Sequence, residues 1–348
     1  MNDNMSKPSV LMVVSKYPPD FGHTTVINNL CKCLNDLGYR SAIGAFSFDD
    51  DPPYNIEKVK LSKIKLLTSG VKYLNFDIIH SHQPRVNYYL LFRKPNKPIV
   101  MHVHGASNKI HNINFKFSML LFKNRITKII AVSNFGYSKI KYLIGKIPTE
   151  VIYNGVNTDL YNPDLPFTYK KGSPQLLFVG GLRKYKNVKT LISIMPKLIQ
   201  KFPNAHLQII GDGDEYEILK TLVKDRKLET KVELTGKIIN EEELRLRYVS
   251  CDLYISASSL EACPIPPFEA MSCAKPLVLY GIHPHEEIIQ ASHAGLIFNS
   301  LNEEEICKKI QEVYENKILF GKEGRNFAIK NSWLNVSKKI INLYEKIL

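Results

Sequence analysis

Short apolar runs alternate along this chain with longer stretches in which apolar residues recur at helical spacing. The run at residues 10–14 is followed by a Pro/Gly loop and then by Val26, Leu30 and Leu34, which share one helical face before Gly38. Similar runs lie at residues 77–80, 98–102, 128–132 and 150–152. Such short runs predict buried strands, and their alternation with amphipathic helices predicts a parallel sheet covered by helices.

The same rhythm restarts after two proline-containing segments, residues 161–166 and 170–174. Strand-like runs follow at residues 175–179, 206–210, 231–235, 253–256 and 276–279, with a long amphipathic stretch at 188–201. Asn240 before three glutamates predicts a helix start, because its side chain and an acidic first turn complement free N–H groups. We therefore predict an α/β protein of two doubly wound, Rossmann-like domains facing across a cleft at the carboxyl ends of both sheets. The predicted domains are residues 1–165 and 166–330, and residues 331–348 form a C-terminal helix that crosses back to the first.

The composition fits a folded protein of this size. With 348 residues, of which 44% are hydrophobic and 23% charged, the chain is neither collagen, coiled coil nor generally disordered. Every apolar run is much shorter than the about 20 residues that span a membrane. The first nine residues are polar and lack the apolar core of a signal peptide. Six cysteines are too few for a disulfide scaffold. We expect a cytoplasmic protein whose cysteines are reduced.

The positive charge is concentrated in the first half of the chain. Residues 1–165 hold 21 Lys and Arg against 11 Asp and Glu (+10), whereas residues 166–348 hold 26 against 22 (+4), out of +14 in total. Residues 78–149 contain 12 basic side chains and no acidic one. Such a segment suits an anionic partner: lipid headgroups, a phosphorylated small molecule or nucleic acid. A surface that only keeps the protein soluble is the plainer interpretation.

Three segments combine a predicted strand end with residues suited to an anionic or hydroxylated ligand. They are residues 17–23, with Gly22; residues 180–186, with two glycines and three cations; and residues 261–269, with a glutamate at each end. Free N–H groups and the helix dipole favour phosphate at such places, and paired carboxylates serve acid/base chemistry, metal binding or hydroxyl recognition. The alternatives are a solvated charged loop for the second segment and a helix cap with one solvated carboxylate for the third.

Two His-x-His pairs, His80/His82 and His102/His104, end predicted strands, where residues i and i+2 share one face. A metal site needs at least one further ligand, and the spacing places no third His or Cys beside either pair. We therefore predict no metal site. Hydrogen-bonded core histidines and substrate-binding or catalytic histidines both remain open.

Taken in order, these segments resemble the retaining glycosyltransferases of family 4, which have the two-domain GT-B fold. The matching segments are residues 16–22, 77–82, 103–105, 131–133, 152–156, 178–182 with Lys186, 210–213, and the pair Glu261 and Glu269. The resemblance covers nearly the whole chain. It implies a retaining glycosyltransferase, of the hexosyl-transferring kind, that uses a nucleotide diphosphate sugar as its donor.

The resemblance also implies roles for individual residues. The residues implied in catalysis are His104, Arg183, Lys186 and Glu261. The residues implied in donor binding are Gly22, Arg183, Lys186, Gly236, Lys237, Glu261, Ile265 and Glu269. The two cations would neutralise the departing diphosphate, Glu261 would bind a sugar hydroxyl, and Glu269 would bind the ribose hydroxyls. His104 would contact the donor sugar near the reacting carbon, backbone groups near Gly236 and Lys237 would hold the base, and neither a metal nor another cofactor is expected.

The chain departs from the family pattern in several places, including Gly22-His23 in place of a common Gly-Gly, and two departures bear on the cations and the sugar contacts. The frequent Gly-Arg-Leu is replaced by Gly180, Gly181 and Leu182, so the arginine must come from Arg183 if it is present at all. Pro264 stands where the family often has glycine, and a proline offers no backbone N–H. The donor sugar is therefore not inferred.

The function we predict is sugar transfer to a glycan or lipid-linked glycan, with the enzyme peripheral on the cytoplasmic membrane face. Residues 115–122, which contain Lys116 and are followed by Lys123 and Arg125, combine apolar and basic side chains that suit headgroups, although a helix packed on the sheet explains the apolar residues equally well. A GT-B nucleotide-sugar epimerase is the alternative within the same fold. A basic nucleic-acid-binding protein is the alternative of another class, although we expect no nucleic acid.

Overall fold

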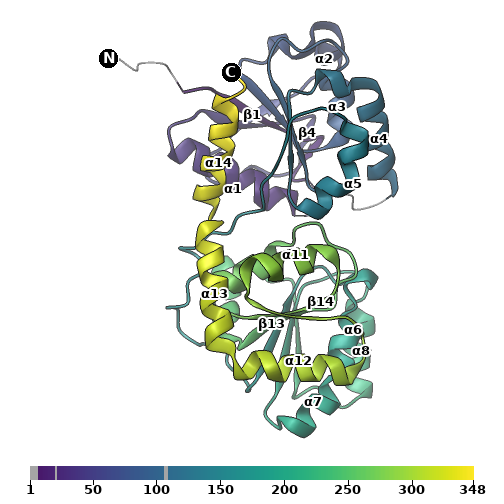
Figure 1. The fold of residues 1–348 in the computed structure, drawn as a ribbon, viewed down its shortest axis with the longest axis vertical. Coiled ribbons are helices and arrows are strands. Elements are labelled where there is room, and N and C mark those ends of the chain that lie inside the picture. Colours follow the sequence, from purple (N-terminus) through teal and green to yellow (C-terminus); the bar gives the residue numbers. More distant parts are fainter. Residues whose placement is uncertain (1–6, 20–21, 106–108) are drawn as a thin grey trace. The chain divides into compact units, whose positions relative to one another are not determined.

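The computed structural model describes residues 7–19, 22–105 and 109–348, which form two units (Figure 1). The first unit comprises the chain up to Gly155 together with Trp333–Leu348, and the second comprises Val156–Ser332. The chain thus passes between the units at Gly155 and again at Trp333. A Cβ on Gly155 would lie 2.7 Å from ring carbons of Trp333, so this crossing leaves no room for a side chain.

The first passage lies earlier than the predicted boundary after residue 165. The predicted linker is part of the second unit, because Tyr161 packs edge-on against the ring of Tyr248 with 5.4 Å between centroids. In addition, the hydroxyl of Ser272 donates a hydrogen bond of 2.6 Å to the carbonyl oxygen of Tyr161. These contacts fix the proline-containing segment to the second unit.

The first unit contains a seven-stranded sheet in the order β5-β3-β1-β6-β7-β8-β9, with all neighbours parallel. Its strands are β1 (Val10–Val13), β3 (Ser41–Ala45), β5 (Glu57–Lys60), β6 (Ile78–Ser81), β7 (Ile99–Val103), β8 (Lys128–Ala131) and β9 (Thr149–Val151); β2 (Lys16–Tyr17) and β4 (Ser47–Phe48) form a separate pair. Its helices are α1 (His23–Asp36), α2 (Lys63–Ser69), α3 (Pro84–Leu90), α4 (Lys109–Phe122), α5 (Asn134–Ile144) and α14 (Trp333–Glu345), with 3₁₀ turns η1 (Gly70–Tyr73) and η2 (Lys123–Arg125).

Helices cover both faces of this sheet. Helices α2 to α5 pack on the face that carries the alternate strand residues Leu11, Ile79 and Met101. The opposite face carries Met12, His80 and His102, and α14 reaches it with Tyr344 while packing beside α1 (Figure 1). This second face is unusually polar for a buried layer, since three buried histidines (His80, His82 and His102) and the half-buried His104 lie on it.

The second unit contains a six-stranded parallel sheet in the order β12-β11-β10-β13-β14-β15. Its strands are β10 (Gln175–Val179), β11 (His206–Ile210), β12 (Val232–Gly236), β13 (Leu253–Ser256), β14 (Leu277–Tyr280) and β15 (Gly295–Phe298). Its helices are α6 (Val188–Ser193), α7 (Met195–Lys201), α8 (Tyr216–Asp225), α9 (Glu241–Ser250), α10 (Ile265–Ser272), α11 (His283–Ser292), α12 (Glu303–Glu315) and α13 (Lys317–Lys330), with the 3₁₀ turn η3 (Lys184–Lys186). In both sheets the first strand lies in the interior. The next strands extend the sheet to one edge, and the later strands extend it to the other edge, which is the doubly wound order of Rossmann-like folds.

Two predictions of local structure had different outcomes. Asn240 caps α9 as predicted, because its side-chain oxygen accepts hydrogen bonds from the backbone N–H groups of Glu242 and Glu243. The long amphipathic stretch at residues 188–201 is helical but is divided into two helices, α6 and α7, at Ile194. Pro196 has no N–H to donate to the carbonyl of Ile192, which favours the break. Among the described residues, no helix has both the length and the apolar character needed to cross a bilayer.

Candidate active site

Two glycine loops approach each other at the carboxyl edge of the second sheet. The N–H of Gly180 donates to the carbonyl of Ile210 at 3.0 Å, and the N–H of Leu182 donates to the carbonyl of Asp212 at 2.9 Å. A Cβ on Gly211, whose φ is +147°, would lie 1.9 Å from the carbonyl oxygen of Gly180. Only glycine permits this approach, which holds the loop after β10 in place.

That loop directs Lys186 toward Glu261. After Gly181 the chain turns through η3, where the N–H of Lys186 donates to the carbonyl of Arg183 at 2.8 Å. The Nζ atom of Lys186 forms an ion pair with Oε1 of Glu261, and these side chains are only 16% and 13% exposed. Arg183 lies on the exposed surface at the start of the turn. The structure therefore brings Lys186 and Glu261 together.

The alternative in which one glutamate of the pair caps the next helix and the other is solvated is not what the structure shows. Helix α10 begins at Ile265 after Pro264, and no side chain from the described parts of the chain caps it. Glu261 instead lies in the loop between β13 and α10 as the partner of Lys186. A half-buried pair of this kind leaves an uncompensated charge when either partner is removed.

His285 lies close enough to this pair to interact with it electrostatically, and the sequence did not predict this. Its Nδ1–H donates to the carbonyl of Tyr280 at 2.8 Å, and its buried Nε2 has no hydrogen-bond partner among the described residues. Burial lowers the pKa of His285, Glu261 opposes this effect, and Lys186 adds to it. His285 is thus a neutral acceptor within electrostatic reach of the ion pair. Its position just after β14, at the same sheet edge as the loops of β10 and β13, was the available signal.

Glu269 has a different environment, although it follows Glu261 by only eight residues and lies within α10. Its Oε2 accepts a hydrogen bond of 2.6 Å from the hydroxyl of Tyr248, and Tyr161 supplies a second hydroxyl. Burial raises the pKa of this carboxyl to about 7, against the opposing effect of the two hydrogen bonds, and Glu241 adds to the rise. The two glutamates of the motif are therefore an ion-paired carboxylate and a carboxyl that titrates near neutrality.

The remaining predicted donor-binding residues are divided between the units. Gly236, with φ +73°, ends β12, and its carbonyl accepts the N–H of Gly211 at 2.9 Å. Lys237 follows it on the surface, and Ile265 is the first residue of α10. These three lie at the same edge of the second sheet as Lys186. Gly22, with φ +72°, precedes α1 in the first unit.

The four predicted histidines meet in the first unit because β6 and β7 are adjacent. The rings of His80 and His102 are 5.3 Å apart with 7° between their planes, and those of His102 and His104 are 4.3 Å apart with 19°. Nδ1 of His82 lies 2.9 Å from Nε2 of His104, and Nδ1 of His80 lies 2.6 Å from the hydroxyl of Tyr344. Spacing along the chain did not reveal this meeting, because it depends on the order of strands in the sheet.

Burial keeps these imidazoles neutral. It lowers the pKa of His80 to about 3, and it lowers the pKa of His82, His102 and His104 well below the usual range with help from the neighbouring rings. One nitrogen from each of His80, His82 and His102 lies within 4.8 Å of the others, so a metal ion is geometrically conceivable. However, in-plane lone pairs of stacked, near-parallel rings do not converge on one point. The absence of a metal stays a prediction.

Comparison with known proteins identifies the family. The model "Glycosyltransferase Family 4" matches residues 22–160, and the model "Glycosyl transferases group 1" matches residues 166–332. The chain belongs to the glycosyltransferases of family 4. This confirms the family resemblance seen in the sequence, and the enzyme is a glycosyltransferase. The matching family models describe glycosyltransferases, not nucleotide-sugar epimerases or nucleic-acid-binding proteins.

This glycosyltransferase has relatives along its whole length. It is 28% identical to an uncharacterized glycosyltransferase of Methanocaldococcus jannaschii over 97% of this chain and 98% of that one. It is 23% identical to a phosphatidyl-myo-inositol mannosyltransferase of Mycobacterium leprae over 85% of this chain and 81% of that one. Its fold matches the Anabaena protein HepE in complex with UDP, with a TM-score of 0.81, 17% identity and coverage of 97% and 100%. HepE has also been crystallised with UDP-glucose.

Proposed function

We propose that this glycosyltransferase binds a nucleotide diphosphate sugar at the carboxyl edge of the second sheet and transfers the sugar with retention of configuration. The observation that carries the proposal is the half-buried pair of Lys186 and Glu261 beside the glycine loops. A lysine there can neutralise a diphosphate, and a carboxylate there can accept sugar hydroxyls. The complexes of HepE with UDP and UDP-glucose support a donor of this class.

The ion pair suits donor binding because it is an arrangement that a ligand can replace. Without a donor, Glu261 compensates the charge of Lys186, and both side chains are largely shielded from solvent. When a diphosphate arrives, the lysine gains an anion of higher charge and Glu261 is released to accept a hydroxyl of the donor sugar. As the leaving group departs, its charge grows, so Lys186 stabilises the transition state more than the ground state. Arg183, at the start of the same turn, would share this task.

The other donor contacts follow from the same edge of the sheet. Glu269 would accept hydrogen bonds from the ribose hydroxyls through lone pairs that the two tyrosines leave, since a carboxylate accepts about four hydrogen bonds. Backbone groups near Gly236 and Lys237 would hold the base, and Ile265 begins the helix that carries Glu269. In the first unit, His104 would contact a hydroxyl of the transferred sugar.

Retention without a metal is the mechanism that we propose. The departing phosphate would take the acceptor proton during front-face attack, so no protein base is required, and the cations of the η3 turn would carry the leaving-group charge. No cofactor beyond the donor takes part in this scheme. The transferred group would be a hexose, and the acceptor a glycan or lipid-linked glycan.

Donor binding tests the proposal directly. Titration of the purified protein with UDP and UDP-glucose, followed by the shift in Tm, should show stabilisation by mass action. Lys186→Met should abolish the shift, whereas Lys184→Met, which removes a neighbouring exposed cation from the same turn, should retain most of it. Equal shifts in the two variants would remove Lys186 from the site. NMR of the product's anomeric proton, and activity in the presence of a chelator, would test retention and metal independence.

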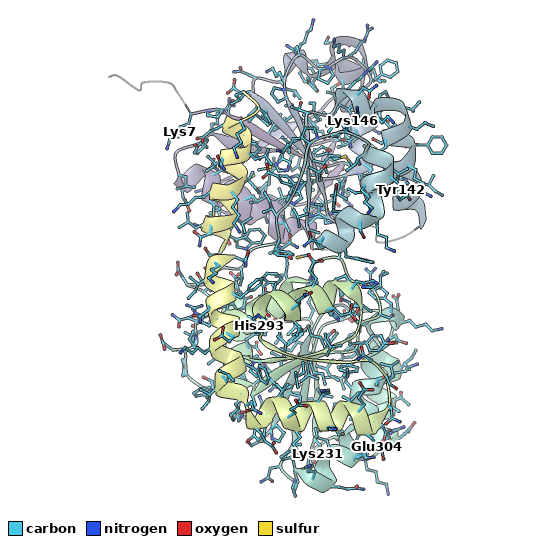
Figure 2. The ribbon with its side chains drawn as sticks, viewed as in Figure 1. Lys7, Tyr142, Lys146, Lys231, His293 and Glu304 are labelled. Atoms are coloured by element: carbon cyan, nitrogen blue, oxygen red, sulfur yellow. The ribbon has the colours of Figure 1, made fainter. Side chains whose placement is uncertain are left out.

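A second proposal concerns the acceptor side. On α4, Phe115 and Met119 pack into the core, whereas Ile113, Phe117, Leu120 and Leu121 are between 54% and 76% exposed. Tyr142 of the adjacent helix α5 is 68% exposed as well (Figure 2). An apolar patch of this kind, with the exposed Lys116 and Lys123 beside it, fits an anionic bilayer surface. We propose that the enzyme binds the cytoplasmic membrane face peripherally through α4.

Arg125, which the sequence grouped with these lysines, has a structural role instead. Its guanidinium donates to the carbonyl oxygens of Leu91 and Phe92, each at 2.6 Å, and lies over the ring of Phe122. These contacts fix the end of α4 against α3. The basic side chains proposed to meet lipid are therefore Lys116 and Lys123. The name of the phosphatidyl-myo-inositol mannosyltransferase shows that a relative acts on a lipid, which supports the proposal.

A further inference from the structure

Three residues on three adjacent strands form a chain of close polar contacts that ends at His104. Met12 lies on β1, His82 directly follows β6, and His104 directly follows β7. Nε2 of His82 lies 3.2 Å from Sδ of Met12, and Nδ1 of His82 lies 2.9 Å from Nε2 of His104. His82 is 1% exposed, whereas His104 is half-buried. Both nitrogens of the inner histidine are thus engaged, and the outer histidine is the member nearer to solvent.

The positions of the protons on these rings follow from counting donors. Both imidazoles are neutral, because burial holds the pKa of each well below its usual range. A neutral imidazole carries one N–H and one bare nitrogen, so each ring has exactly two tautomers. The hydrogen bond between His82 and His104 needs one proton, and either ring can supply it.

The sulfur of Met12 decides between the two possibilities. A thioether is a weak acceptor and never a donor. If Nε2 of His82 carries the proton, it donates to Sδ, and the 3.2 Å contact is a weak hydrogen bond. If Nε2 is bare, its lone pair faces the sulfur lone pairs at that distance without a proton between them. The first tautomer is therefore favoured, and it leaves Nδ1 of His82 bare.

A bare Nδ1 on His82 must accept the proton of its neighbour. The hydrogen bond then runs from Nε2–H of His104 to Nδ1 of His82, and the remaining nitrogen of His104, Nδ1, is bare. We propose that Met12 and His82 are positioning residues that fix His104 in the Nε2–H tautomer, so that His104 presents a lone pair and accepts a hydrogen bond from a sugar hydroxyl. This inference rests on the proposed function for the identity of the ligand, and on the contacts and burial of His82 and His104 for the tautomer.

The surrounding rings hold His104 in this orientation. His102 stacks on it at 4.3 Å, and the ring of His23 lies 4.4 Å from it. Tyr344 on α14 contacts His80, which stacks on His82 with 4.5 Å between centroids. A metal ion bound to His82 would have to displace one of its two hydrogen bonds, whereas the tautomer chain uses both of them as they are.

The fixed tautomer has a consequence for the ligand class. A hydroxyl can donate to Nδ1 of His104, but a carboxylate or phosphate oxygen has no proton to donate and would face a lone pair. Because the array stays neutral, it also offers no positive charge to attract such a group. The sugar group that reaches His104 is therefore a hydroxyl and not an acid.

Imidazole NMR tests the tautomer without any enzymatic activity. In protein labelled with ¹⁵N-histidine, long-range ¹H–¹⁵N correlation spectra distinguish protonated from bare ring nitrogens, and the His104 signals are assigned by comparison with His104→Gln. At pH 7.5 we expect Nε2 of His104 protonated and Nδ1 bare. The reverse pattern in the wild-type protein overturns the inference whether or not the protein binds a nucleotide sugar.

A matched pair of variants tests the role of the sulfur. Met12→Leu conserves volume and removes the acceptor, so the ratio of His104 tautomers should shift by about two- to fivefold, as expected for loss of a weak hydrogen bond. Met101→Leu is the control, because its sulfur contacts Asn87 on the other face of the same sheet. An unchanged ratio in Met12→Leu, or an equal change in both variants, contradicts the proposal.

Ligand binding separates this inference from the proposed function. Met12→Leu should leave the affinity for UDP unchanged and weaken binding of UDP-glucose by a similar two- to fivefold factor, since only the sugar reaches His104. If the tautomer is as expected but neither UDP nor UDP-glucose binds the wild-type protein, the proposed function fails and the positioning of His104 stands. Equal weakening of UDP and UDP-glucose by Met12→Leu would show that the effect is a general one on the fold.

Discussion

The hydroxyl of Tyr248 lies 2.6 Å from Oε2 of Glu269 and donates a hydrogen bond to it. The two residues come from neighbouring helices, α9 and α10, and Tyr161 packs edge-on against the same tyrosine ring. Burial raises the pKa of Glu269 more than the hydrogen bonds from Tyr248 and Tyr161 lower it, so this pKa rises to about 7. A carboxyl that loses its proton near neutral pH links both stability and ligand binding to pH.

The first prediction concerns stability. The pKa of Glu269 is raised in the folded protein from 4.5 to about 7, so the folded state binds the proton more tightly than the unfolded chain does. Stability from this group is therefore full below pH 4.5 and is lost as pH rises toward 7. Glu269→Gln, which stays neutral, should become more stable relative to wild type over this range, by on the order of 1 to 3 kcal/mol. Urea denaturation at a series of pH values measures the difference, and a difference independent of pH would contradict the raised pKa.

The second prediction concerns the ion pair. Lys186→Met should lower turnover by at least about a hundredfold, because it removes a charge that stabilises the leaving group. It should also destabilise the protein, on the order of 2 kcal/mol, because Glu261 is left without its partner at 13% exposure. Adding Glu261→Gln should restore Tm but not turnover. Recovery of both in the double variant would mean that the pair serves the fold and not the reaction.

The third prediction separates the two glutamates by their effect on UDP, which contains the ribose and the diphosphate but no donor sugar. Glu269→Ala should weaken UDP binding because the ribose loses its acceptor. Glu261→Gln should leave UDP binding unchanged or make it tighter, since Glu261 competes with the diphosphate for Lys186. Isothermal titration with UDP measures both. Similar losses of affinity in the two variants would refute the division of roles.

The strands predicted from sequence are those with strong apolar patterns. The apolar runs that form β1, β10, β11 and β13 are buried, and the loops that follow these strands contain the glycines and Glu261 of the site. Strand β3, with the sequence Ser-Ala-Ile-Gly-Ala, was not predicted because small residues dominate it, although it is fully buried. Strand β5 is mostly exposed and lies at the sheet edge, so its pattern is weak.

Contacts that depend on the order of strands in the sheet could not be predicted from the sequence. Spacing showed that His80 and His82 share a face, but not that His102 lies beside them on the next strand. Likewise, nothing along the chain connects His285 with Lys186, which lies about a hundred residues earlier. Lys186 and Glu261, which follow β10 and β13, form an ion pair because the carboxyl ends of parallel strands meet at one edge of the sheet. Their roles, and that of Glu269, stay predictions.

The last prediction tests the membrane surface. At about 1 kcal/mol per basic residue near an anionic bilayer, Lys116 and Lys123 together with the exposed apolar residues of α4 should give measurable binding. The protein should therefore sediment with vesicles that contain phosphatidylglycerol and not with phosphatidylcholine vesicles. Most of this binding should be lost in high salt, since the screening length falls from about 10 Å at 0.1 M to about 3 Å at 1 M.

Two variants distinguish a specific α4 surface from general attraction of a basic protein. Lys116→Glu with Lys123→Glu should abolish sedimentation, and Leu120→Ser should reduce it in low salt without changing the charge. The matched control is Lys322→Glu with Lys330→Glu, which makes the same charge change on exposed positions of α13 in the second unit. Because charge near the bilayer acts only over the screening length, the control should retain binding if α4 is the contact. Equal loss in both double variants would assign the attraction to net charge, and α4 would then have no special role at the membrane.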